Sequence, residues 1–180
     1  MNVETLRFGK ITVNDDAIIH FEEGLPGFSK LRSFFLLESN DNQLFLWLQS
    51  LDDPRIAFPV IEPQLSSPSY KVPISEKELI QLEETDLKRI KVLCIVTIPE
   101  NPCDMTANLR APILISLDHH KAVQVISPDS TYPVKHPIFN DLQRFVSRHL
   151  NESPRSPSLE GAEKLAPVEF HIHQLKGPDA

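Results

Sequence analysis

The feature that most constrains the fold is a series of short β-favouring runs, separated by turn residues, along the first part of the chain. Such runs at a spacing of roughly 8–12 residues are typical of antiparallel barrels and sandwiches. We therefore expect a mainly β fold built as a small antiparallel barrel-like domain, with one or two short helices. The expected strands are at 5–13, 17–21, 33–37, 44–49 and 56–61, with turns at 14–16, 41–42 and 52–54.

The middle of the chain contains one clear helix signal and one strongly apolar run. A serine followed three residues later by glutamate forms a capping box and predicts a helix over 75–84, with a second short turn at 86–87. The nearly continuous apolar run at 90–98 predicts a strand that is buried on both faces. Residues 111–117 and 122–126 then predict a hairpin across a polar turn.

The character of the sequence changes after Pro137, which suggests a core followed by an extension. We place the β domain at 1–138 and a C-terminal extension at 139–180. Apolar residues at near-helical spacing predict an amphipathic helix over 139–150. A Ser-, Pro- and Glu-rich linker follows at 151–167, and then a short tail segment at 168–180, which starts with strand-like alternation.

Charge and cysteine usage narrow the class of partner. The net charge is −7, with 18 basic against 25 acidic residues, and basic residues do not alternate with aromatic ones. This argues against an RNA-binding barrel and against direct nucleic-acid binding, and it suits a basic protein partner. With no signal-peptide pattern and no long apolar segment, we expect a cytoplasmic chain with no membrane contact. Cys94 and Cys103 are expected to be reduced thiols.

Catalytic signatures are missing from the sequence. The five glycines form no phosphate loop or dinucleotide fingerprint, and no nucleophile elbow or zinc-protease motif is present. A hydrolase or transferase would need a carboxylate pair with shifted pKa values in a deep pocket, which sequence alone cannot show. The histidines could be considered as zinc ligands, but a structural zinc site needs four ligands and no cysteine lies at a fitting spacing. We therefore expect no metal, no cofactor and no enzymatic activity. The histidines considered are His119, His120, His136, His171 and His173.

The stretch F-E-E-G-L-P-G-F at 21–28 is the strongest candidate for a partner contact. Its glycines permit a tight turn, and we expect Phe21 and Phe28 to anchor both ends of that turn in the core. Leu25 and Pro26 at the apex are less securely buried, and an exposed apolar apex is a plausible contact for a partner helix. On this interpretation, Leu25→Asp weakens partner binding without lowering the melting temperature.

Acidic residues suggest how a basic partner could be steered to this apex. If Glu22 and Glu23 lie at the same end of the barrel as Asp52 and Asp53, the four carboxylates form one negative rim. Two further partner-binding candidates are Gln49, at the end of an apolar strand, and Asn108, directly before another. The alternative for Asn108 is a turn residue whose side chain bonds neighbouring backbone groups.

Several motifs, taken together and in order, resemble the flagellar assembly factor FliW family. No single motif is a chemical signature, but five of them in register cover residues 3–138. They are F-E-E-G-L-P-G-F (21–28), L-Q-S-L-D-D-P-R-I-A-F-P-V (48–60), V-L-C-I-V-T-I-P (92–99), T-A-N-L-R-A-P-I-L-I (106–115) and Q-V-I-S (124–127).

This resemblance implies a function that the composition does not show. Members of the family are small, barrel-like, non-enzymatic proteins that bind flagellin in the cytoplasm. They also antagonise the translational repressor CsrA, a small basic RNA-binding dimer, without competing for its RNA-binding surface. Relief of this repression restores flagellin synthesis. The alternative is a flagellin-binding chaperone with no CsrA branch, and the resemblance implies no role for 139–180.

Overall fold

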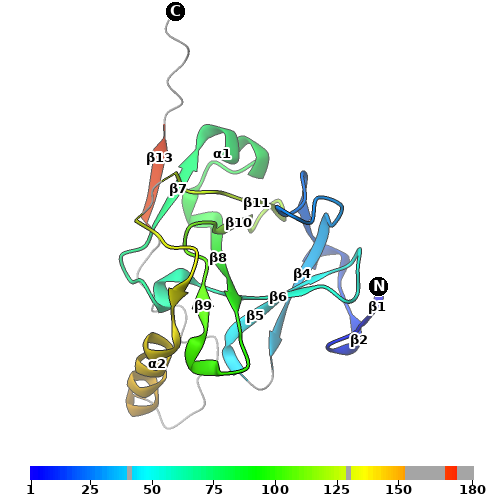
Figure 1. Cartoon of the computed structure of the whole chain (residues 1–180). Coiled ribbons are helices and arrows are strands. Elements are labelled where there is room, and N and C mark those ends of the chain that lie inside the picture. Colours follow the sequence, from blue (N-terminus) through cyan, green and yellow to red (C-terminus); the bar gives the residue numbers. More distant parts are fainter. Residues whose placement is uncertain (40–41, 129–130, 153–168, 174–180) are drawn as a thin grey trace, which may run out of the picture.

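The computed structural model describes residues 1–39, 42–128, 131–152 and 169–173, and its centre is a closed β-barrel (Figure 1). Seven strands follow one another around the barrel in the order β10–β11–β3–β4–β5–β6–β8, and a further pairing of β8 with β10 closes it. The mainly β, barrel-like fold is therefore confirmed. The strands are β3 (Ile19–Phe21), β4 (Ser33–Ser39), β5 (Asn42–Ser50), β6 (Ala57–Ile61), β8 (Ile90–Thr97), β10 (Ile113–Ser116) and β11 (Lys121–Gln124).

The barrel contains one pairing that the sequence did not predict. Strand β11 runs parallel to β3, with Lys121 opposite His20 and Ala122 opposite Phe21, whereas the other pairings around the barrel are antiparallel. The hairpin expected from 111–126 is present as β10 and β11. The parallel pairing brings that hairpin beside the 21–28 turn, and this proximity shapes the candidate site.

Apolar side chains from all seven strands fill the barrel. Their burial follows from the two-residue period of a strand, which sends alternate side chains inward. The fully inward set is Ile19, Phe21, Phe34, Leu48, Val60, Leu93, Ile113, Ile115 and Ala122, and Leu25 from the 21–28 turn joins it. This inner core fixes the position of the turn relative to the strands.

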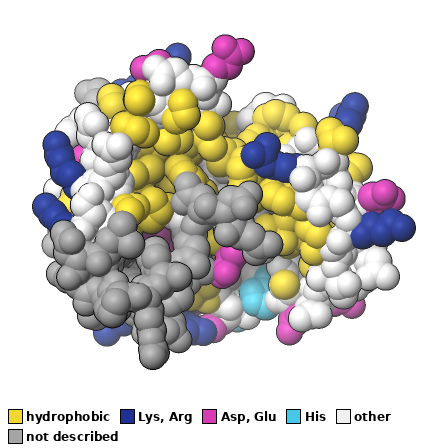
Figure 2. All heavy atoms as spheres, turned by 90° about the horizontal axis from the view of Figure 1, so that it is seen from below, with side chains coloured by type: hydrophobic (Ala, Val, Ile, Leu, Met, Phe, Trp, Pro, Cys, Tyr) yellow, Lys and Arg dark blue, Asp and Glu magenta, His cyan; other side chains and the backbone are white. Residues whose placement is uncertain are grey.

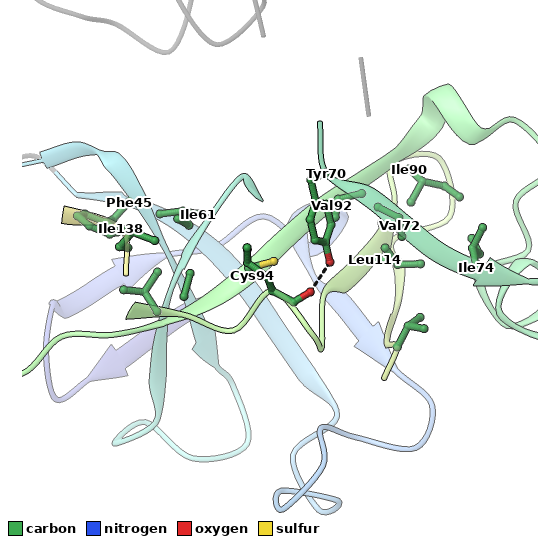
Figure 3. Close-up of a cluster of buried hydrophobic side chains, with 14 of the residues drawn as sticks. Phe45, Ile61, Tyr70, Val72, Ile74, Ile90, Val92, Cys94, Leu114 and Ile138 are labelled. Carbon is green, nitrogen blue, oxygen red and sulfur yellow. Dashed lines mark hydrogen bonds between the residues drawn. The ribbon is translucent and has the colours of Figure 1, made fainter. Parts of the chain in front are cut away.

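A second core lies outside the barrel wall, as the close-up in Figure 3 shows. Val92 and Cys94 of β8 belong to it, while Leu93 between them faces the barrel interior, so β8 is buried on both faces as predicted from 90–98. The covering layer includes β7 (Lys71–Ser75) and Tyr70. Burial raises the pKa of the Cys94 thiol to about 12, which suits an inert core thiol.

The predicted helices are both present. α1 (Glu76–Leu82) begins at the expected capping box and buries Leu82, and the second turn is η3 (Leu87–Arg89). The helix expected at 139–150 is α2 (Phe139–Glu152), which buries Leu142 in the outer core. The remaining short elements are η1 (Asp15–Ala17), η2 (Pro63–Leu65), η4 (Pro102–Asp104), β9 (Thr106–Ala107) and β12 (His136–Pro137).

The expectation for the N-terminal end is modified, whereas the strand-like segment expected near the C-terminal end is present. The single strand expected at 5–13 is instead a hairpin of β1 (Asn2–Thr5) and β2 (Gly9–Thr12), because the chain reverses through residues 6–8 into Gly9 at φ +69°. In the tail, β13 (Glu169–His173) pairs with β7. Most of the predicted linker at 151–167, and residues 174–180 of the tail, lie outside the described residues.

Candidate functional site

The 21–28 turn is built around two glycines in the left-handed backbone region. Gly24 has φ +72° and Gly27 has φ +82°. A side chain at Gly24 is excluded twice over, since a Cβ there would lie 2.8 Å from the Cα and carbonyl oxygen of Ser29. The turn is closed where the amide of Phe28 donates to the carbonyl oxygen of Leu25 at 2.7 Å. The glycines therefore allow the chain to double back tightly on itself.

This tight turn directs Leu25 inward, contrary to expectation. Leu25 is only 2% exposed and packs in the barrel interior with Phe21, so it is a core residue and not an exposed contact. Phe28, expected to be an anchor in the core, is 39% exposed and lies edge-on against Phe58 with ring centroids 5.2 Å apart. Pro26 remains exposed at the apex, as expected. The available apolar surface of the turn is therefore formed by Pro26 and Phe28.

A pocket of about 580 Å³ lies beside this turn, between it and the β11–α1 region. The turn contributes Glu22, Glu23 and Pro26 to the wall, and Gln81 of α1 approaches Glu23 with its amide at 3.4 Å. The remaining lining residues are His20, Phe21, Gly24, Leu25, Gly27, Ser29, Arg32, Lys121, Ala122, Val123 and Gln124. The partner-contact candidates Glu22, Glu23, Leu25 and Pro26 therefore all line this pocket, which the sequence did not predict.

Lys121, the basic residue that β11 contributes to the pocket lining, already forms an ion pair. The Lys121 ammonium lies 2.5 Å from a carboxylate oxygen of Glu83, and this hydrogen bond lowers the pKa of Glu83 below its ordinary value. Glu22 and Glu23, in contrast, are exposed at the mouth. A partner approaching the pocket therefore meets the two exposed carboxylates of the turn together with the exposed Arg32, while Lys121 is largely neutralised by Glu83.

The second acidic turn connects to this end of the barrel but has a structural role. Asp52 accepts hydrogen bonds from the amides of Arg32 and Ser33 at 2.6 and 2.8 Å, and Arg32 in turn accepts one from the Phe21 amide. Asp53 forms an ion pair with Arg55 at 2.8 Å, and this partner lowers its pKa to about 2. Both carboxylates thus have internal partners, so Glu22 and Glu23 are the better candidates for contact with another protein.

Gln49 and Asn108 also make internal hydrogen bonds. Gln49 is completely buried, and its amide donates to the carbonyl oxygens of Ser50 and Ile56 at 3.0 and 2.9 Å, which holds the β5–β6 turn. Burial therefore removes it from the surface on which a partner could bind. The Asn108 side-chain oxygen accepts from the Ala111 amide at 3.1 Å, which confirms the turn interpretation offered for that residue.

The described part of the chain gives little support for metal binding by the histidines considered from the sequence. Within it, no group of three or more His, Cys, Asp or Glu side chains is arranged to hold a metal ion. His119 is exposed in the β10–β11 turn, and the side chains of His171 and His173 lie outside the described set. Across the helices whose residues are described, none is long and apolar enough to cross a membrane.

Sequence reasoning missed the residues that complete the pocket, above all Arg32, Gln81 and Lys121. Gln81 follows the capping box within the predicted helix, so its half-buried position on α1 could have been anticipated. Lys121 could not, because it reaches the site only through the parallel β11–β3 pairing. Arg32 adjoins a turn whose direction depends on the burial of Leu25.

A second surface is the face of the molecule seen from below in Figure 2. Hydrophobic side chains gather over much of it, and basic, acidic and histidine side chains lie both at its margins and among the hydrophobic ones.

Comparisons with known proteins identify one family. The model of the FliW protein family matches residues 2–138. A flagellar assembly factor FliW from Caldanaerobacter subterraneus subsp. tengcongensis is 40% identical over 148 residues, covering 82% of this chain and 99% of the relative. Its counterpart from Bdellovibrio bacteriovorus is 39% identical over 146 residues, covering 81% of this chain and 83% of the relative. A crystal structure of the flagellar assembly factor FliW superposes with a TM-score of 0.72 at 32% identity, covering 77% of this chain and 97% of that one.

Proposed function

Because this chain belongs to the FliW family and acts in flagellar assembly, we propose that it binds flagellin as a cytoplasmic chaperone. It performs no catalysis in this role. The same protein antagonises the repressor CsrA without occupying the RNA-binding surface of that dimer, and so restores flagellin synthesis. Binding of flagellin alone, with no CsrA branch, is the alternative.

The pocket beside the 21–28 turn is the observation that supports this proposal. Pro26 exposes apolar surface in its wall, Phe28 exposes more on the same turn outside the pocket lining, and the pocket of about 580 Å³ extends toward α1. Grooves of this kind receive apolar side chains from one face of an amphipathic helix. We place the flagellin contact at this surface, with Leu25 acting beneath it as the buried support that positions Pro26.

Charge supports the CsrA branch. The chain has a net charge of −7, and Glu22 and Glu23 are exposed at the pocket mouth. Exposed carboxylates of this kind raise the association rate of a basic partner more than they strengthen the final complex. Asp52 and Asp53 contribute to the overall negative field, although their oxygens are held by Arg32, Ser33 and Arg55.

The experiment is a pair of titrations with purified flagellin and purified CsrA. We expect Pro26→Asp to weaken flagellin binding about tenfold, which corresponds to roughly 1.4 kcal/mol. Pro68→Asp is the matched control, since Pro68 is also exposed but lies outside the pocket lining. Equal effects of the two substitutions would show that the flagellin contact lies elsewhere.

The CsrA branch is tested with Glu22→Lys combined with Glu23→Lys. We expect a slower association rate at low salt and convergence with the unaltered chain at high salt, because salt screens exposed charges. Glu4→Lys combined with Glu100→Lys changes the net charge by the same amount at other exposed positions. If the chain captures flagellin but CsrA does not bind at any ionic strength, the flagellin-only alternative replaces the proposal.

A further inference from the structure

Strand β7 has two edges, and the amides at both ends of one edge donate to side chains outside any strand ladder. The Lys71 amide donates to the Tyr132 hydroxyl at 2.9 Å, and the Ser75 amide donates to the Glu78 carboxylate at 2.7 Å. Between them stands Pro73, which has no amide N–H to donate. Since backbone groups alternate from edge to edge along a strand, residues 71, 73 and 75 share this edge.

The opposite edge of β7 carries the amides of Val72 and Ile74. These residues are 0% and 1% exposed, and amides in such surroundings require hydrogen-bond partners. Among the described residues β7 pairs with one strand only, β13, in a parallel register that sets Val72 opposite Phe170 and Ile74 opposite Ile172. In a parallel ladder of this register, the bonding groups on β13 belong to residues 169, 171 and 173.

The two paired strands differ in how widely they are shared. Strand β7 lies within residues 2–138, the part that matches the family, whereas β13 lies beyond it. An unpaired strand edge is a template for another strand. The edge thus belongs to the part of this chain that matches the family, and a strand from beyond that part covers it.

We propose that the Val72–Ile74 edge of β7 is a strand-acceptor site, occupied in this protein by its own segment Glu169–His173. A partner segment that binds there is extended and alternates apolar with polar residues, as V-E-F-H-I-H does at 168–173. Main-chain hydrogen bonds supply most of the recognition in this mode of binding. The extension therefore controls access to the edge, and a partner strand binds only when β13 is released.

Amide hydrogen exchange on the full chain tests the pairing. His171→Pro removes the N–H that bonds to the Val72 carbonyl, so we expect exchange at Val72 and Ile74 to become about tenfold faster or more. His171→Ala removes the imidazole but keeps the N–H, and it should leave their exchange unchanged. Amides of β8 serve as an internal reference for global stability. Unchanged exchange at Val72 and Ile74 in His171→Pro would overturn the proposal.

A disulfide test checks register independently of exchange. In a Cys103→Ser background, Lys71→Cys with Glu169→Cys places the thiols at directly opposite positions, while Lys71→Cys with His171→Cys offsets them by two residues. We expect an intramolecular bond to form readily in the first variant only. Equal yields, or bonds only between molecules, would contradict occupation by the chain's own segment.

Binding of a separate peptide tests whether β7 can accept a strand from another molecule. A synthetic peptide of residues 168–175 should bind the His171→Pro chain at least tenfold more tightly than the unaltered chain, in which β13 blocks the edge. His171→Ala should behave like the unaltered chain. If the peptide binds all three chains equally, or none of them, β7 is not a strand-acceptor site.

Discussion

The carboxylate of Asp52 lies 2.6 Å from the backbone nitrogen of Arg32, and this contact joins the β5–β6 turn to the segment that follows the 21–28 turn. The same oxygen accepts from the Ser33 amide at 2.8 Å. Hydrogen bonds to an ionised acceptor are the stronger kind, although exposure weakens these. We therefore expect Asp52→Ala to lower the free energy of unfolding by about 1–2 kcal/mol, measured by urea denaturation.

Asp53→Ala is the natural comparison for that variant, because Asp53 has the same charge but pairs only with Arg55. Exposed ion pairs contribute little, so its effect should be clearly smaller. Equal losses in the two variants would mean that the Asp52 contact with Arg32 does not hold the two turns together. Because Asp52 has this structural role, reversing the charges of Asp52 and Asp53 together would combine a loss of stability with any loss of partner binding.

Leu25 provides the second prediction, which reverses the sequence-based one. Because Leu25 is 2% exposed inside the barrel, Leu25→Ala should destabilise the chain by about 2–5 kcal/mol. Leu25→Asp should be worse still, since it buries a charge without a partner. Pro26→Ala is the exposed control, and its melting temperature should barely change. A Leu25→Asp chain with an unchanged melting temperature would show that the side chain is not in the core.

These residues show why the sequence predicted the architecture better than the site. Alternation, turn residues and the capping box are local signals, so the strands, α1 and the doubly buried β8 could be read directly. The orientation of the turn apex is not local. Whether Leu25 or Phe28 faces inward depends on the space left between strands that are distant in the sequence.

The parallel β11–β3 pairing illustrates the same limit. Lys121 and His20 are about a hundred residues apart in the sequence, and no period or turn signal connects them. Sequence patterns therefore could not predict the pocket wall that this pairing forms. Gln49 was mistaken for a surface group for a related reason, because its burial depends on the path of the β5–β6 turn.

The two glycines of the turn should respond differently to substitution. Both have positive φ, but a Cβ at Gly24 would lie 2.8 Å from Ser29, whereas a Cβ at Gly27 would meet nothing within 4 Å. Gly27→Ala should lose only the roughly 1 kcal/mol typical of a left-handed residue, whereas Gly24→Ala should lose clearly more. Thermal unfolding of both variants checks this. An equal loss would mean that backbone conformation, and not the close approach to Ser29, governs the turn.

Asp53 gives a prediction about pH. Its hydrogen bonds with Arg55 lower its pKa from an ordinary 3.8 to about 2, so the pairing stabilises the folded chain above pH 3.8 and is lost as the pH falls toward 2. A carbon-13 titration of the Asp53 carboxyl group should therefore have a midpoint near pH 2. In Arg55→Gln the midpoint should return toward 3.8. A midpoint near 3.8 in the unaltered chain would contradict the pairing in solution.

The last prediction concerns the outer core, where the Tyr70 hydroxyl donates to the Leu109 carbonyl at 2.6 Å (Figure 3). Burial raises the Tyr70 pKa far above its ordinary value, so this donor keeps its proton wherever the chain is folded. Tyr70→Phe leaves a buried carbonyl unpaired and should lower the free energy of unfolding by about 1–3 kcal/mol.

Tyr132→Phe makes a useful comparison for Tyr70→Phe, because it preserves the ring, whose centroid lies 4.6 Å from that of Tyr70. It removes only a hydroxyl that accepts from the exposed Lys71 amide, and water can replace that acceptor. Tyr132→Phe should therefore lose less than Tyr70→Phe in urea denaturation. The reverse order would mean that the layer over β8 depends more on its rim at Lys71 than on the buried Tyr70–Leu109 bond.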